Sequence, residues 1–206
     1  MKACIRDTVT LIFIAATFPL WGPVRVFGLG GREIGLFVTF GQSLSLIPGT
    51  LGVWLRRAYY VMTLGDCAWD VGIGFGTWFS KRNVAIEPRV SIGAHCTVGI
   101  CGIGRGTLLG SNIDVLSGRH QHGSTDSMTA RRAQLAVFTR VEIGRNVWIG
   151  NRAVIMADIG DDCVIGAAAV VVRPIPPATM AAGNPAVVKK SLVKEAPLSR
   201  PKGVLP

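Results

Sequence analysis

A six-residue repeat between Ile86 and Val171 constrains the fold of this chain more than any other feature of its sequence. Each step opens with an aliphatic residue, and Gly or another small residue usually follows it; the clearest copies begin at Ile92, Ile149 and Ile165. Six residues are too long for a two-residue hairpin and too short for a strand–helix–strand unit. One short strand and one tight turn per step, coiling around an axis, fits this period.

The repeat occupies residues 68–173 and divides the chain into three parts. The aliphatic residues that open the steps are expected to stack inward as a ladder: Ile73, Ile86, Ile92, Val98, Ile103, Leu109, Val115, Ile143, Ile149, Ile155, Ile159, Ile165 and Val171. Stacked strands leave unpaired edges at both ends of a coil, so residues 1–67 and the tail 174–206 are candidates to cover them. Because prolines between Pro174 and Pro177 interrupt strand continuation, we expect the coil to end there.

Composition narrows the partners that such a chain can have. The 206 residues make one domain, or one domain with an appendage, and 22 Lys and Arg against 12 Asp and Glu give a net charge of +10. This excess favours an anionic partner such as a membrane face or a phosphorylated small molecule. The basic residues are scattered and lack interleaved aromatics, which ranks nucleic acid last.

The first 67 residues are unusually apolar. The uncharged stretch 8–24 is shorter than the roughly 20 residues that span a bilayer, and Pro19 and Pro23 interrupt it. A segment lying in the membrane interface therefore fits better than a spanning helix. Asp7 precedes the apolar run and no signal-peptide cleavage motif follows it, so we expect no signal peptide.

A helix is predicted around Leu51–Met62, where Arg56 and Arg57 form a basic spot beside Trp and Tyr residues. Such a spot suits a lipid headgroup boundary. The alternative is a cap that packs on the repeat and hides the open end of its sheet. Both interpretations remain open at this point.

The five cysteines give no indication of a metal site or of disulfides. They are Cys4, Cys67, Cys96, Cys101 and Cys163, an odd number without a C-x-x-C pair. We interpret them as small buried hydrophobic residues in a reducing compartment, and we predict no metal.

Three segments, 141–150, 163–171 and 175–186, resemble the hexapeptide-repeat acyltransferases. They carry N-V-W-I-G, V-I-G-A, P-P and A-A-G-N-P in that order, as in the maltose/galactoside O-acetyltransferase-like and polysaccharide O-acetyltransferase branch. The resemblance covers about Asp70 to Lys190. It implies an all-β, left-handed parallel β-helix with an apolar, partly helical N-terminal extension and a protruding loop. It further implies a homotrimer with acetyl-CoA bound between neighbouring coils.

The repeat breaks once, at residues 117–140, and this break holds two of the three histidines. In the family a general-base His lies at the start of such a loop, which makes His120 the candidate base and His122 the reserve or an assisting group. A neutral imidazole can take the proton of an attacking hydroxyl. The alternative is that both are ordinary surface residues. His95 lies within a repeat, where a solvent-facing structural role is expected.

The resemblance also implies the acetyl-CoA contacts. Trp148 would wall the acyl and pantetheine passage, or pack across the trimer interface. Asn151 and the backbone of Gly166 and Ala167 match positions that bind the pantetheine arm. Arg173 and Lys190 match family positions whose basic side chains face the phosphates. The alternative is that both are solvated charges at the end of the coil. One further family Arg is Val187 in this chain, and the coil from Ile149 to Ile159 is two residues shorter than in the sugar acetyltransferases.

The function predicted from these residues is acetyl transfer from acetyl-CoA to a sugar hydroxyl of an exopolysaccharide or surface glycan. The enzyme would be cytoplasmic, with peripheral membrane contact through the N-terminal segment. Two alternatives remain: a soluble acetyltransferase of a free sugar, serine or an antibiotic, and a non-catalytic β-helix scaffold. A carbonic-anhydrase-like relative would need three His ligands, and the three histidines are poorly spaced for that role.

Overall fold

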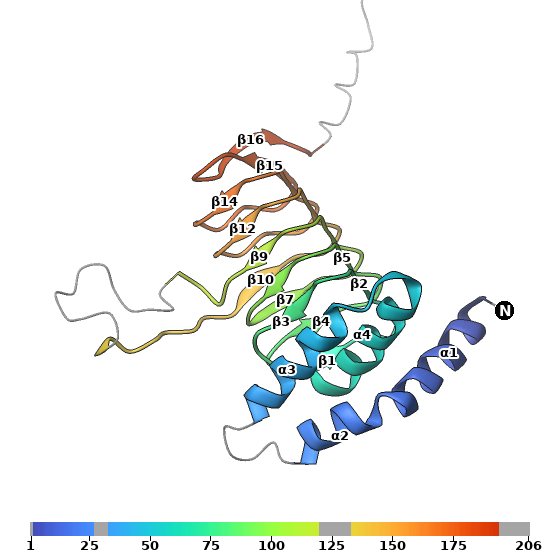
Figure 1. The fold of residues 1–206 in the computed structure, drawn as a ribbon. Coiled ribbons are helices and arrows are strands. Elements are labelled where there is room, and N and C mark those ends of the chain that lie inside the picture. Colours follow the sequence, from blue (N-terminus) through green and yellow to red (C-terminus); the bar gives the residue numbers. More distant parts are fainter. Residues whose placement is uncertain (1, 27–32, 120–132, 194–206) are drawn as a thin grey trace, which may run out of the picture.

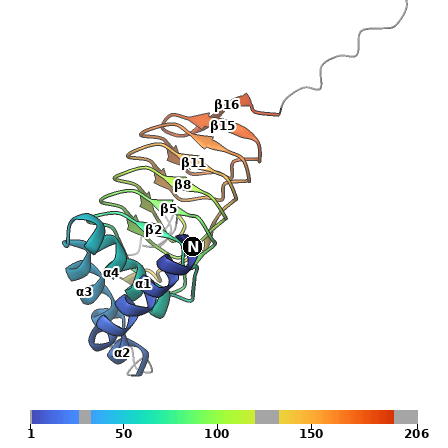
Figure 2. The same ribbon diagram turned by 90° about the vertical axis from the view of Figure 1, so that its right-hand side faces the viewer.

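The computed structural model describes residues 2–26, 33–119 and 133–193 and consists of four helices followed by a β-helix (Figure 1). The helices are α1 (Lys2–Ala16), α2 (Phe18–Val26), α3 (Glu33–Ser45) and α4 (Gly49–Thr63). They gather at one end of the coil, and β16 lies at the opposite end (Figure 2). The helix predicted around Leu51–Met62 is α4, and its prediction is confirmed.

Three sheets form the faces of the coil. Sheet A contains β1 (Asp66–Cys67), β4 (Ala85–Ile86), β7 (Cys101–Ile103) and β10 (Val141–Ile143). Sheet B contains β2 (Gly72–Ile73), β5 (Ser91–Ile92), β8 (Leu108–Leu109), β11 (Trp148–Ile149), β13 (Val164–Ile165), β15 (Thr179–Ala182) and β16 (Val187–Ser191). Sheet C contains β3 (Trp78–Phe79), β6 (Thr97–Val98), β9 (Asp114–Val115), β12 (Val154–Ile155) and β14 (Val170–Val171). All pairings are parallel except β15–β16, and the predicted left-handed parallel β-helix is confirmed.

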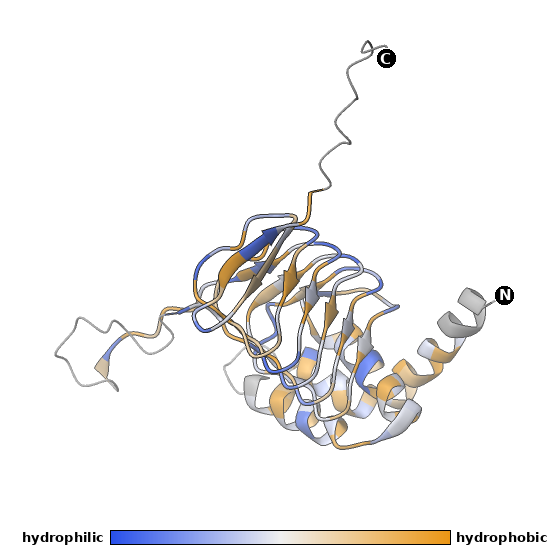
Figure 3. Ribbon diagram, turned by 90° about the horizontal axis from the view of Figure 1, so that it is seen from above, coloured by the Kyte–Doolittle hydropathy of each residue, from blue (hydrophilic) through white to orange (hydrophobic). Residues whose placement is uncertain are grey.

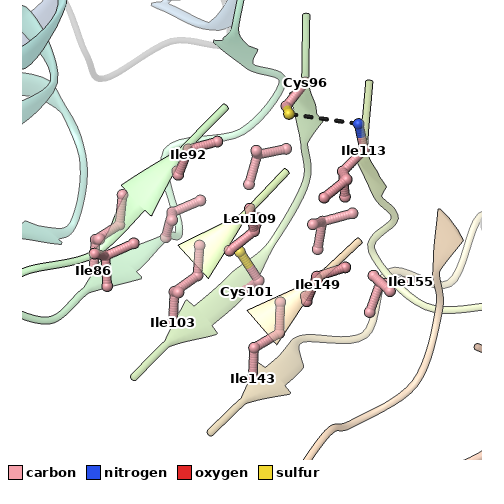
Figure 4. Packing of buried hydrophobic residues seen from close by; sticks show 14 of the residues in the cluster. Ile86, Ile92, Cys96, Cys101, Ile103, Leu109, Ile113, Ile143, Ile149 and Ile155 are labelled. Atoms are coloured by element: carbon pink, nitrogen blue, oxygen red, sulfur yellow. Dashed lines mark hydrogen bonds between the residues drawn. The ribbon is translucent and has the colours of Figure 1, made fainter. Parts of the chain in front are cut away.

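The aliphatic residues that open each repeat form the core of the coil (Figure 4). In sheet A, for example, Ile86 pairs with Ile103 and Ile103 with Ile143, and each is only 2% exposed. The preceding residue of most strands points outward, because side chains alternate along a strand. Burying an Ile side chain contributes about 1.5–3 kcal/mol, so the ladder provides the main stabilisation of the coil.

Left-handed residues form a column along each of two corners of the coil. Between sheets A and B they are Arg89, Gly106, Asn146, Asp162 and Ala178, all with positive φ. Between sheets B and C they are Gly76, His95, Asn112, Arg152, Ala168 and Gly183. At the corner between sheets C and A, positive φ occurs among the described residues at Gly118, where the protruding loop leaves the coil. The repeat is thus interrupted at the corner that lacks a column of left-handed residues.

The helices α3 and α4 pack on the first turn of the coil, and Arg56 holds this junction together. Its guanidinium donates through Nε to Ile73 O at 3.0 Å, and through Nη1 to Leu44 O at 3.1 Å and Ile47 O at 2.8 Å. Arg56, Tyr59 and Tyr60 are fully buried. The prediction that Arg56 forms a basic spot at a headgroup boundary is therefore wrong, because this side chain faces the coil.

At the other end the coil continues past the prolines, so the expectation that it ends at Pro174 is wrong. Ile175 bridges Ile159 in parallel, and β15 then adds a strand to sheet B before the antiparallel β16 covers it. The prolines lie at corners, whereas the ladder bond comes from the non-proline Ile175, whose N–H donates to Asp158 O at 2.9 Å. Proline there removes no donor that the sheet needs.

The four cysteines whose side chains the structure describes are buried free thiols: Cys67, Cys96, Cys101 and Cys163. This agrees with their interpretation as small hydrophobic residues. Burial raises the pKa of the Cys67 and Cys101 thiols to about 12.

Candidate functional site

Trp148 stands on the outer face of sheet B. It is the first residue of β11, so its side chain points away from the core, and it is 57% exposed. The neighbouring strands place Leu108 on one side and Val164 on the other, in register with it. Next along the sheet, Met180 is in register with Val164. Four apolar side chains therefore follow one another along the outer face.

A groove of about 270 Å³ begins at this tryptophan. We call it the Trp148 groove; its lining consists of Trp148, Gly150, Asn151, Val164, Ile165, Gly166, Ala167 and Met180. The structure thus brings together four of the residues predicted to bind acetyl-CoA, namely Trp148, Asn151, Gly166 and Ala167. They come from two successive turns of the coil, at sheet B and its corner with sheet C.

A ladder of side-chain caps runs along this corner and ends in the groove. Ser111 Oγ accepts from the backbone N–H of Ala94 at 3.2 Å, and Asn151 Oδ1 accepts from the N–H of Ser111 at 2.8 Å. In the next turn this position is Ala167, whose side chain has no acceptor. Within the described part of the chain, the N–H groups of Asn151 and Ala167 consequently have no acceptor.

Asn151 also offers its side-chain amide. Because Oδ1 is held by the N–H of Ser111, Nδ2 is the remaining polar atom of the group and donates only. Gly110 lies beneath this amide, where a Cβ would collide with Asn151 Oδ1. The groove therefore presents several N–H donors beside apolar side chains, an arrangement that suits a narrow ligand with carbonyl oxygens.

The protruding loop is anchored at the corner between sheets C and A. Thr139 N–H donates to Ser117 O at 3.0 Å, and the buried Ser117 Oγ accepts from Ile100 N–H at 2.8 Å. Gly118 has φ +83°, and a Cβ there would collide with Thr139 Oγ1. The two limbs are thus held together at their base. The predicted base His120 and its neighbour His122 lie outside the described residues.

The two predicted phosphate-binding residues lie on different sides of the coil. Lys190 is exposed on β16 and pairs with Met180, so it continues the groove side of sheet B. Arg173 is exposed after β14, at the corner between sheets C and A, where the loop also leaves. Neither residue lines the groove itself.

The groove and the base of the loop lie on different sides of the coil. The groove lies on sheet B and its corner with sheet C, whereas Gly118 at the base of the loop and Arg173 lie at the corner between sheets C and A. Sheet C separates the two within one chain.

His95 is exposed, as expected, and its ring meets the edge of Phe75 with 5.3 Å between the ring centroids. Among the residues that the structure describes, no three His, Cys, Asp or Glu side chains form a cluster able to hold a metal ion.

Sequence reasoning missed several members of the groove. Val164 and Met180 follow Trp148 at intervals of one coil turn, and this recurrence could have identified them. Ser111 and Gly110 belong to the turn before the loop interruption, and only the pairing of β8 with β11 reveals that they neighbour Asn151.

Comparisons with known proteins agree with this geometry. The chain is 34% identical over 159 residues to Nodulation protein L of Rhizobium meliloti (strain 1021), covering 67% of this chain and 84% of that protein. It is 34% identical over 127 residues to the putative lipopolysaccharide biosynthesis O-acetyl transferase WbbJ of Escherichia coli K12, covering 57% of this chain and 62% of that protein. The chain covers between 52% and 84% of the length of the first relatives that it matches. No family model matches the chain.

A solved structure shares the fold. The hexapeptide-repeat-containing acetyltransferase VCA0836 of Vibrio cholerae O1 biovar eltor, complexed with acetyl coenzyme A, superposes with a TM-score of 0.67 at 24% identity. The match covers 79% of this chain and 91% of that one.

Proposed function

This chain belongs to the hexapeptide-repeat O-acetyltransferases, and on that premise we propose that it transfers an acetyl group from acetyl-CoA to a sugar hydroxyl. The acceptor is part of an exopolysaccharide or surface glycan, and His120 is the general base, with His122 assisting it. The observation that carries this proposal is the Trp148 groove, in which backbone and side-chain donors line an apolar channel.

The donor fits the groove by its chemistry. The pantetheine arm of acetyl-CoA is a narrow chain of methylenes and amides. Its amide oxygens can accept from Nδ2 of Asn151 and from the N–H groups of Asn151 and Ala167, while Val164 and Met180 pack against its methylenes. Trp148 walls the acyl end. Lys190 and a neighbouring copy's Arg173 supply positive charge for the phosphates.

The reaction needs one proton transfer and one exchange of bonds. His120 takes the proton of the sugar hydroxyl as the oxygen attacks the thioester carbonyl carbon. A tetrahedral oxyanion forms, and its charge requires a hydrogen-bond donor beside the thioester. The carbon–sulfur bond then breaks, and the proton passes from the imidazolium to the departing thiolate. The products are an acetyl ester and the CoA thiol.

A homotrimer completes the site. Because sheet C separates the groove from the loop within one chain, the loop of one copy serves the groove of the next. Threefold symmetry repeats this contact at every interface, so each of the three sites draws on two chains.

The acceptor class follows from the relatives and the charge. WbbJ is named for lipopolysaccharide biosynthesis, and a net charge of +10 suits an acceptor carried on phosphate. We place the enzyme in the cytoplasm, where acetyl-CoA is made, in peripheral contact with the inner membrane face through residues 1–67.

Product analysis tests this function. Purified protein is incubated with acetyl-CoA and a panel of glycan oligosaccharides, nucleotide sugars, free sugars and serine, and acetylated products are identified by mass spectrometry. Esterification of a glycan or carrier-linked sugar supports the proposal, whereas esterification of serine alone contradicts it. His120→Ala should lower kcat by at least about 100-fold with the trimer intact, and His122→Ala should lower it less. Full activity in His120→Ala would exclude this residue as the base.

A further inference from the structure

The first two helices, with the residue that joins them, bury threonine side chains and expose large apolar ones. Thr10 and Thr17 are 0% and 1% exposed, whereas Leu11, Ile12 and Phe18 are 56%, 61% and 57% exposed. A helix that faces water shows the opposite pattern, with apolar residues packed on the core. These helices thus carry apolar residues on the outer side as well as on the inner side, where Val24 is buried and Phe13 packs on Trp54, and hydrophobic residues recur along the described part of α1 in Figure 3.

The two helices form an elbow. The segments Thr8–Ala16 and Phe18–Val26 are bent by 69° at Thr17, and none of the described helices is by itself long and apolar enough to span a bilayer. Thr17 Oγ1 donates to Phe13 O at 2.8 Å and Trp21 Nε1 to Ile14 O at 2.9 Å, so the bend is held by defined hydrogen bonds.

The elbow is fixed to the folded body on its inner side only. Phe13 stacks on Trp54 of α4 with 6.1 Å between the ring centroids, and Arg25 Nε donates to Met62 O at 2.8 Å. Leu11, Ile12 and Phe18 on either side of the bend are all more than half exposed. Val26, at the end of α2, is 70% exposed.

Charge at the edge of this face is positive. Arg25 is exposed beside Val26, and it lies near Arg82, because the two guanidiniums donate to the neighbouring carbonyls of Met62 and Thr63 at 2.8 and 2.7 Å. On the neighbouring helix, Arg57 lies over the Trp54 ring at 4.6 Å. Of the four arginines between Thr8 and Leu64, Arg56 is buried and Arg32 lies outside the described residues, so Arg25 and Arg57 supply the positive charge here. An apolar face with a basic edge complements an anionic lipid surface.

We propose that the outer face of the elbow, Leu11, Ile12, Phe18 and Val26, inserts into the interface of an anionic phospholipid bilayer, with Arg25 at the level of the lipid phosphates. This docking sharpens the peripheral contact of the proposed function, and it would present the active sites to a glycan acceptor held on a membrane carrier. Its test reads vesicle binding rather than acetyl transfer, so the two proposals can fail separately.

Vesicle co-sedimentation of the full-length protein provides the test. Wild type should bind vesicles of phosphatidylcholine with phosphatidylglycerol at least tenfold more tightly than vesicles of phosphatidylcholine alone, and salt should weaken the binding. The variant Leu11→Ser/Ile12→Ser/Phe18→Ser should bind at least tenfold more weakly. Arg25→Gln should lose most of the preference for the anionic lipid.

A matched control lies at the opposite end of the molecule. Val187 and Val188 on β16 are 49% and 47% exposed, so Val187→Ser/Val188→Ser removes exposed apolar side chains far from the elbow and should bind vesicles as wild type does. Circular dichroism and oligomer size establish that each variant is folded. Equal loss in the β16 control, or no vesicle binding by wild type, overturns the proposal. If wild type does not bind vesicles and an elbow variant has a lower oligomeric state, this face instead contacts a second copy of the chain.

Discussion

Replacing Arg56 with methionine tests how the helices are joined to the coil. The side chain is fully buried and donates to carbonyls of Ile73, Leu44 and Ile47. Methionine fills much of the same volume but leaves the carbonyls of Ile73 and Ile47 without this donor, whereas Leu44 O still accepts from Ile47 N–H at 3.3 Å. Each buried acceptor left unpaired costs about 1–3 kcal/mol.

The substitution also relieves two costs. Burial lowers the pKa of Arg56, which means that folding disfavours its charged form, and Nη2 is buried without a partner. Removing the charge recovers part of the penalty for burying it. We therefore expect the free energy of unfolding to fall by about 3 kcal/mol, within the combined cost of about 2–6 kcal/mol for two unpaired carbonyls.

Urea unfolding followed by circular dichroism measures this change, at one fixed protein concentration because association contributes to stability. Arg105→Met, at an exposed position in the coil, is the matched control and should change stability by no more than about 0.5 kcal/mol. A loss below about 1 kcal/mol for Arg56→Met would refute the interpretation that this guanidinium joins the helices to the coil.

Three further predictions concern the groove, the loop and the cysteines. Ala167→Ser would supply the missing acceptor for Asn151 N–H, so this donor would no longer be free for acetyl-CoA. KM for acetyl-CoA should rise about tenfold, the equivalent of one hydrogen bond, with kcat retained. An unchanged KM in steady-state kinetics would contradict the role of this donor. Gly118→Ala places a Cβ against Thr139 Oγ1 at positive φ, so kcat should fall about tenfold or more while acetyl-CoA binding by calorimetry persists; loss of binding instead would show that the loop base supports the groove. Burial raises the pKa of Cys101 to about 12, so at pH 8 only about one thiol in 10⁴ is ionised, and iodoacetamide should modify this residue only after unfolding; rapid labelling of the native protein by mass spectrometry would oppose this.

The sequence period predicted the coil and its inward ladder because a strict repeat has few physical solutions. It did not predict that Arg56 is buried while Arg57 remains partly exposed. Adjacent residues on a helix point about 100° apart, so a basic pair in the sequence need not form one basic surface. The prolines after Arg173 wrongly predicted the end of the coil. They lie at corners, where the sheet does not need the N–H group that proline lacks.

The resemblance identified four residues that the fold brings together in the groove, but it could not reveal why they present free donors. That depends on the register between Ser111, Asn151 and Ala167, and a loop interrupts the repeat between the first two. The sequence also did not reveal that α1 buries Thr10 and exposes Leu11. The sequence shows that Thr10 and Leu11 are neighbours, but only packing against α4 decides which of them faces outward.

Mixed trimers test most directly that the groove of one copy works with the loop of another. Ala167→Trp fills the groove, and His120→Ala removes the proposed base, so each variant alone should be inactive. If the two are co-expressed in equal amounts, about three quarters of the trimers are mixed, and each mixed trimer contains one intact site of three. The account predicts recovery of about a quarter of wild-type acetyl transfer. Mixed trimers that form but show no activity above the two separate variants would contradict it.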